Sequence, residues 1–139
     1  MIKNKIPSKT PNNRGNIIRF STRVLLKMSS AIRHSREFNE LIQKQLDTGT
    51  PKNIIAHFSA KWCGPCKRMN PEWLEYKKTL DPALFHTLEI DVDINDYVTG
   101  FCEVNSVPTF AILQNGTLKS KITNSNIDTI HHWIQENST

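Results

Sequence analysis

The sequence predicts an α/β fold, in which a central mixed β-sheet carries helices on both faces. Short apolar runs typical of strands alternate with longer segments whose apolar residues repeat at helical spacing. One of these runs, Asn53 to Phe58, is nearly continuous and is typical of a central strand buried on both faces. Further along, Asn115-Gly116 lies between two apolar runs and predicts an antiparallel hairpin.

The first elements of the predicted domain lie before the central strand. Ala31 to His34 is expected to form a short strand, and Ser35 is the candidate N-cap of the helix that follows it. Gly49 is expected to end this helix. The apolar residues that repeat at helical spacing in it are Phe38, Leu41, Ile42 and Leu46.

The remaining elements follow the central strand in regular alternation. A second helix begins near Gly64 and is expected to stop at Asp81-Pro82. Its apolar face comprises Met69, Trp73, Tyr76 and Leu80. The later elements are a strand at Leu84 to Asp91, a short helix around Asp96 to Cys102, hairpin strands at Phe110 to Leu113 and Leu118 to Ile122, and a last helix with Ile127, Ile130 and Ile134 on one face.

The pentapeptide Trp62-Cys63-Gly64-Pro65-Cys66 places two thiols at a spacing that closes into a small disulfide ring and reopens. It falls between the central strand and the second helix, so Cys63 is predicted to lie at the helix N-terminus. The unpaired N–H groups and positive end of a helix favour a thiolate there. Cys63 is therefore the predicted attacking nucleophile, and Cys66, one turn further and less exposed, would resolve the mixed disulfide.

A metal site is the main alternative for these thiols. Zinc needs about four ligands. The other candidates are Cys102 and five scattered histidines, and none of them pairs with a second C-x-x-C at ligand spacing. A purely structural disulfide is also disfavoured, because closing so short a loop restricts the unfolded chain little. No metal is expected.

The motif and three later features resemble the thioredoxin family. Trp62 to Lys67 matches the family's active-site run, and Pro71 falls where thioredoxins carry a kinking proline in the helix. Val107-Pro108-Thr109 resembles the loop whose cis-proline faces the active site, and Asn115-Gly116 resembles the hairpin turn that follows. Cys102-Glu103-Val104, just ahead of that proline, resembles the sequence at this position in the eukaryotic branch of the family. The resemblance covers roughly Ala31 to Glu136 and implies the thioredoxin fold.

The resemblance also implies an activity and its partners. A member of this family is a dithiol-disulfide oxidoreductase that reduces protein disulfides, here through Cys63 and Cys66. Gly64-Pro65 resembles the reducing version of the motif, Pro108 would present backbone to the substrate, and Trp62 would form part of the apolar rim. The family implies an NADPH-dependent thioredoxin reductase as electron donor and substrates such as peroxiredoxins. The protein is expected to act as a monomer and to bind no cofactor itself.

Two positions depart from the family pattern beneath the active site. Thioredoxins usually carry a buried aspartate where this chain has His57 and a lysine where it has Glu89. In the family, the acid helps to take the proton from the resolving thiol. A neutral imidazole accepts a proton as a carboxylate does, so His57 is predicted to serve this role with Glu89 orienting it. Alternatively, His57 and Glu89 only satisfy each other's hydrogen-bonding and charge requirements beneath the active site and have no role in catalysis.

A third departure raises a second functional hypothesis. The stretch Ile122-Thr123-Asn124-Ser125 lacks the glycine that thioredoxins carry at the rim of the substrate groove. A chain with this change and the exchanged charges could be a binding module or a subunit of a larger complex, with incidental redox activity. The intact cysteine pair argues against this alternative.

Charge separates residues 1–30 from the predicted domain at 31–139. Nine of the 18 Lys and Arg residues precede the first acid, Glu37, while the rest of the chain holds nine basic and all 13 acidic residues. Residues 1–15 are predicted to be disordered. Residues 16–28 read as a basic amphipathic helix, and such acid-free leaders are typical of mitochondrial transit peptides.

Residues 1–30, called the leader below, also predict where the protein acts. Arg19-Phe20-Ser21 resembles a processing site, so the protein is expected in the mitochondrial matrix, and a start at Met28 would give a cytosolic form. A basic arm for nucleic acid or a membrane surface and a solvated tail remain alternatives. The domain itself predicts no nucleic-acid partner. No apolar run approaches the ~20 residues of a membrane span, and unpaired Cys102 suits a reducing compartment.

Overall fold

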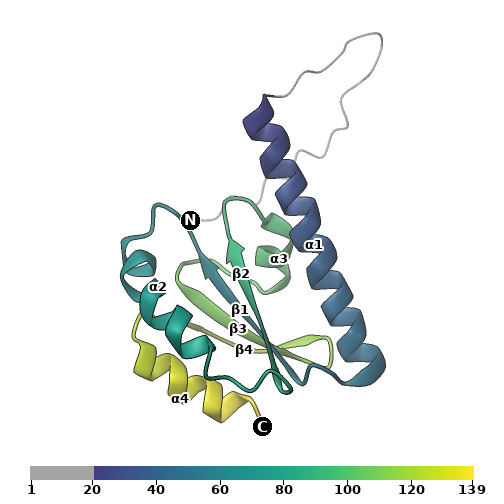
Figure 1. The fold of residues 1–139 in the computed structure, drawn as a ribbon, viewed down its shortest axis with the longest axis vertical. Coiled ribbons are helices and arrows are strands. Elements are labelled where there is room, and N and C mark those ends of the chain that lie inside the picture. Colours follow the sequence, from purple (N-terminus) through teal and green to yellow (C-terminus); the bar gives the residue numbers. More distant parts are fainter. Residues whose placement is uncertain (1–20) are drawn as a thin grey trace.

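A mixed sheet of four strands forms the centre of the computed structural model, which describes residues 21–139 (Figure 1). The strands are β1 (Asn53–Ser59), β2 (Phe85–Asp91), β3 (Thr109–Gln114) and β4 (Thr117–Thr123). Their spatial order is β2-β1-β3-β4, with β1 parallel to β2 and every other pairing antiparallel. The predicted α/β class and mixed sheet are therefore confirmed.

Helices cover both faces of this sheet (Figure 1). On one face, α2 (Gly64–Lys77) and α4 (Ile127–Asn137) pack Trp73 and Ile134 against Ile55 and Phe110. On the other face, α1 (Thr22–Thr48) and α3 (Asp96–Phe101) pack Phe38 and Val98 against strand residues. The strand residues of this second cluster are Ile54, Ala56, Phe58, Leu88, Ile90, Ala111 and Leu113. Alternate residues of β1 thus supply both cores, as its continuous apolar run predicts.

The predicted strand at Ala31 to His34 is wrong, because these residues lie inside α1. Helix α1 begins after the N-cap Ser21, whose side chain accepts a hydrogen bond from the backbone N–H of Val24, so Ser35 is not a cap. No glycine or proline interrupts the chain between Ser21 and Gly49, and four residues within a helical pattern cannot end the helix by themselves. The predictions for residues 1–20 lie outside the described part of the chain.

The other boundaries lie close to those predicted. Gly49 caps α1 in the left-handed region, with φ of 71°. Helix α2 ends at Lys77, earlier than the predicted stop. At the hairpin, Asn115 and Gly116 have φ of 52° and 77°, as the turn requires. A Cβ on Gly116 would lie 2.6 Å from a Leu46 side-chain atom, so this glycine is also needed for packing against α1.

No helix within residues 21–139 is both long enough and apolar enough to cross a membrane.

Candidate functional site

The two cysteines of the motif lie at the N-terminus of α2 and form a disulfide. Cys63 is the N-cap residue, and its Sγ accepts a hydrogen bond of 3.2 Å from the backbone N–H of Cys66. Pro65 occupies the first turn of the helix, where a missing N–H costs no hydrogen bond. Once the disulfide is reduced, the N–H and the helix dipole favour a thiolate on Cys63.

The two cysteines are almost equally exposed, although the sequence predicts that Cys66 is the less exposed of the two. Cys63 is 4% exposed and Cys66 is 3% exposed. Cys66 also lines a hollow of about 390 Å³ together with Lys61, Lys67 and Asp91. The feature that distinguishes the cysteines is therefore the N-cap position of Cys63.

Trp62 adjoins Cys63 in the chain and is exposed, whereas Pro108, in the loop before β3, is buried. Trp62 is 59% exposed, and its indole Nε1 donates a hydrogen bond of 2.8 Å to Oδ2 of Asp93. The Val107–Pro108 peptide bond is cis, as the resemblance implies, and Val107 packs against the core cluster that contains both cysteines. Asp93 could not be predicted from the sequence, because nothing in the local pattern indicates a partner 31 residues after the tryptophan.

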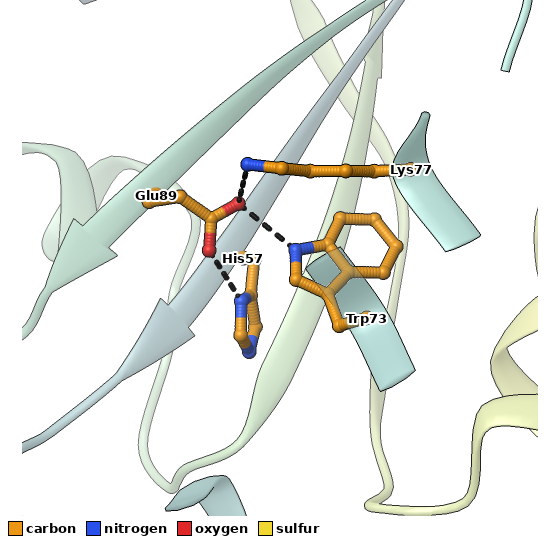
Figure 2. Close-up of polar contacts among 4 residues, drawn as sticks. All are labelled: His57, Trp73, Lys77 and Glu89. Atoms are coloured by element: carbon orange, nitrogen blue, oxygen red, sulfur yellow. Dashed lines mark hydrogen bonds and ion pairs between the residues drawn. The ribbon is translucent and has the colours of Figure 1, made fainter. Parts of the chain in front are cut away.

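His57 and Glu89 form a network that extends beyond the predicted pair (Figure 2). His57 lies opposite Glu89 in the β1–β2 register, and the Nδ1–Oε1 distance between them is 2.7 Å. Trp73 Nε1 donates to Glu89 Oε2 at 2.9 Å, and Lys77 Nζ lies 3.4 Å from the same oxygen. The network therefore joins two strands to α2, the helix that begins at the active-site cysteines.

The two ring nitrogens of His57 have different surroundings. An ionised carboxylate only accepts hydrogen bonds, so Nδ1 carries the proton when it donates to Glu89. Nε2 is buried and has no hydrogen-bond partner among the described residues. The ring is 1% exposed, stacks on Phe110 at 4.3 Å between ring centroids, and meets the edge of Trp73. In neutral His57, Nε2 is thus a buried acceptor without a donor.

Helix α2 connects the active-site cysteines with Trp73, the residue that contacts His57. Cys66, Met69 and Trp73 are the buried residues of this helix and are spaced three and four residues apart, so they share one face. Trp73 on that face contacts His57. Cys66 is therefore the buried residue of α2 nearest to the helix N-terminus, and it packs in the core cluster with Phe58, whereas Trp73 packs in the cluster with Phe110.

Glu89 remains ionised in this setting. Burial raises its pKa and is the largest single influence, but the hydrogen bond and electrostatic attraction of His57, the hydrogen bond of Trp73 and the charge of Lys77 together lower it. The net result is a pKa below the ordinary value. The ionised form holds Nδ1 of His57 as a donor.

Glu89→Gln is expected to destabilise the protein at neutral pH and much less in acid. Because the pKa of Glu89 is lowered from 4.5, the stabilisation by its carboxylate is complete above about 4.5 and is lost as pH falls through the folded-state value. Urea unfolding followed by tryptophan fluorescence, at about pH 7 and about pH 3, measures the difference between the proteins. A difference that stays constant or grows on acidification would contradict this assignment.

Cys102 is free and fully buried, in the same core cluster as Cys63 and Cys66. Burial raises its pKa to about 12, while Lys121 lowers it and Glu103 raises it by smaller amounts. A thiol with this pKa stays protonated at neutral pH and is a poor nucleophile.

We therefore expect iodoacetamide to modify two cysteines of the reduced native protein and a third only after denaturation. Intact mass measured at neutral pH counts the added groups. Rapid modification of Cys102 in the native protein would show that its burial opens readily, and a Cys102→Ser variant identifies the site.

No group of three or more His, Cys, Asp or Glu side chains within residues 21–139 is arranged to hold a metal ion.

A C-x-x-C disulfide at a helix N-terminus on a mixed α/β sheet, in a chain with a cis-proline before β3, defines a protein that exchanges dithiols and disulfides. A sequence model of the thioredoxin family matches residues 29–136, and the chain belongs to this family. It is a thiol-disulfide oxidoreductase.

Individual relatives agree with this assignment. Human thioredoxin is 32% identical over 100 residues, which cover 72% of this chain and 93% of the human protein. The structure of oxidised mitochondrial thioredoxin 3 from Saccharomyces cerevisiae superposes with a TM-score of 0.61 at 28% identity, covering 73% of this chain and 89% of that one. A chain from a structure on thiol resolution in yeast mitochondrial 1-Cys peroxiredoxin via glutathione/thioredoxin systems gives a TM-score of 0.61 at 29% identity, covering 73% and 88%.

Proposed function

We propose that the protein is a mitochondrial reductant of protein disulfides, with Cys63 as nucleophile and Cys66 as resolving thiol. The observation that carries the proposal is the N-cap position of Cys63, where the Cys66 N–H points at its sulfur. A substrate that docks there meets the sulfur favoured as thiolate. The exposed indole of Trp62 offers an apolar contact beside it.

The reaction runs in two exchange steps. The Cys63 thiolate attacks one sulfur of the substrate disulfide, forms a mixed disulfide and releases the other sulfur as a thiolate. Deprotonated Cys66 then attacks the Cys63 sulfur, which closes the Cys63–Cys66 disulfide and releases the second substrate thiol. The substrate gains two electrons and two protons, and the dithiol loses them.

Turnover needs a source of electrons that returns the disulfide to the dithiol. We assign this task to an NADPH-dependent thioredoxin reductase, so the chain uses NADPH only indirectly. Peroxiredoxins are the proposed substrate class, supported by the similarity to the chain from the yeast peroxiredoxin study. The protein is proposed to work as a monomer.

Reduction of insulin by the purified protein with NADPH and a thioredoxin reductase tests this function. Steady NADPH consumption with precipitation of the insulin B chain is expected, and a Cys63→Ser protein is the matched control. A binding module with incidental redox activity would instead leave NADPH consumption at the rate of the reductase and insulin without this protein. That alternative rests on the absent rim glycine, the unusual 123–126 segment and the exchanged charges at His57 and Glu89, and it gains no support from the arrangement at the disulfide.

Removal of the leader is the second part of the proposal. The mature protein in mitochondria should begin near Ser21 or within the next dozen residues. A chain that begins at Ser21 keeps the N-cap of α1, whereas a cut further along shortens this helix. Mass spectrometry of the protein isolated from the matrix determines the N-terminus. An intact Met1 there, or a tagged protein found only in the cytosol or nucleus, would contradict the proposal.

A further inference from the structure

The N-terminal half of α1 displays an apolar stripe that the redox site does not use. Five of the eleven exposed large hydrophobic residues in the described chain lie within this half. They are Val24, Leu25, Leu26, Met28 and Ile32, which are 40% to 65% exposed. Figure 1 shows these first turns of α1 extending beyond the sheet, whereas the second half packs on it through Phe38, Leu41 and Ile42.

Helical spacing gathers four of these side chains on one side. Val24, Met28 and Ile32 lie four residues apart, and Leu25 is the i−3 neighbour of Met28. Only Leu26 falls outside this stripe. Isolated exposed apolar residues are ordinary, but a contiguous stripe on a helix indicates a surface that something covers.

The rest of this half-helix is basic. Arg23, Lys27, Arg33 and Arg36 lie on its other sides, and no acidic residue precedes Glu37 anywhere in the chain. Arg23 and Lys27 also line a hollow of about 630 Å³ together with Lys61, the residue next to Trp62. The positive charge therefore continues from α1 toward the active-site end of the domain.

We infer that this half of α1, which a mature chain beginning near Ser21 would retain, is a docking surface for an anionic lipid bilayer. A helix with apolar residues on one side and Lys and Arg on the others lies in the membrane interface with its apolar side inserted. Each basic side chain near an anionic bilayer strengthens binding roughly fivefold. An acidic protein partner would satisfy the charges, but the unbroken stripe with cations on both flanks fits a continuous lipid surface better.

The helix is formed before it binds, so association does not have to order it. The Ser21 cap and the absence of glycine and proline maintain the helix up to its first turn. A preformed stripe avoids the entropic cost that disordered leaders incur on binding. Arg23 and Lys27 line the hollow beside Lys61 on the side of α1 away from the stripe, so docking would leave the Cys63–Cys66 disulfide facing away from the bilayer.

Co-sedimentation of the full chain with lipid vesicles tests the inference. The chain should bind vesicles containing phosphatidylglycerol at about 0.1 M salt, lose binding as salt rises, and not bind pure phosphatidylcholine. Leu25→Glu places a charge in the stripe and should weaken binding ~10-fold or more. Leu74→Glu is the matched control, because it makes the same change at an exposed position of α2 and should leave binding within ~2-fold of wild type.

The redox chemistry serves as an independent check. The Leu25→Glu and Leu74→Glu proteins should both reduce insulin at the wild-type rate, and a Cys63→Ser protein should still bind vesicles. Retained insulin reduction would show that the Leu25→Glu protein is folded, so its loss of vesicle binding could be attributed to the altered stripe.

Hydrogen exchange of the wild-type protein provides a readout without any mutation. Anionic vesicles should slow exchange in residues 22–33, which are mostly exposed in the free protein. The inference is overturned if no anionic vesicle binds, if Leu25→Glu binds as tightly as wild type, or if neutral vesicles bind equally well. It is also overturned if poly-glutamate displaces the protein from vesicles and protects the same amides, because the partner would then be an acidic polypeptide.

Discussion

Cys63→Ser is expected to abolish disulfide reduction, whereas Cys66→Ser should retain the first exchange and accumulate substrates as mixed disulfides. In the Cys66→Ser protein, the backbone N–H of residue 66 can still donate to the Cys63 sulfur, since the bond does not involve the Cys66 side chain. The nucleophile thus keeps its activation but loses the thiol that would release it. Non-reducing gels, with and without dithiothreitol, measure the trapped adducts.

Cys102→Ser is the control for this experiment. Cys102 is fully buried, and its raised pKa predicts that its removal changes neither reduction nor trapping. Adducts on the Cys63→Ser protein with none on the Cys66→Ser protein would reverse the two roles. That outcome would mean that substrates reach Cys66 through the hollow that it lines, and not Cys63 at the N-cap.

His57→Ala is expected to slow resolution of the mixed disulfide far more than the first attack by Cys63. The buried Nε2 of His57 has no partner among the described residues and Nδ1 is held by Glu89, so Nε2 is the ring nitrogen free to accept a proton, and we expect it to take the proton of Cys66. Proton acceptors of this kind typically contribute ~100-fold or more. Stopped-flow fluorescence of Trp62 can follow both steps.

The pH dependence distinguishes proton transfer from packing. Loss of the acceptor matters less as pH rises, because hydroxide then ionises the thiol without help. Glu89→Gln should shift the pH profile without removing activity, since Glu89 contacts His57 and not the thiol.

His57→Phe is the matched control for volume. It keeps a ring stacked on Phe110 and against Trp73 but has no nitrogen. If His57 accepts the proton, the phenylalanine protein should be as slow as the alanine protein in the resolving step. Equal rates for wild type and both variants at every pH would leave His57 as a packing residue only.

Sequence pattern by itself was enough for most of the fold. A nearly continuous apolar run predicts β1, the Asn115-Gly116 pair predicts the hairpin, and Gly49 predicts the end of α1, because each depends on neighbours within a few residues. The predicted strand at 31–34 fails for the same reason. A short apolar pair within a segment free of glycine and proline fits a strand or a helix, and tertiary structure decides between them.

The candidate site likewise has one part that depends on neighbouring residues and another that depends on tertiary contacts. The cysteine spacing and the helix after it are local, so the sequence determined the disulfide pair and the N-terminal position of Cys63. Only the tertiary structure brings Trp73 and Lys77 to Glu89, since that contact requires the β1–β2 register and the packing of α2 on the sheet. The free side of α1 is likewise a tertiary property. The apolar spacing of that helix is visible in the sequence, but whether the sheet covers it depends on where the chain folds back.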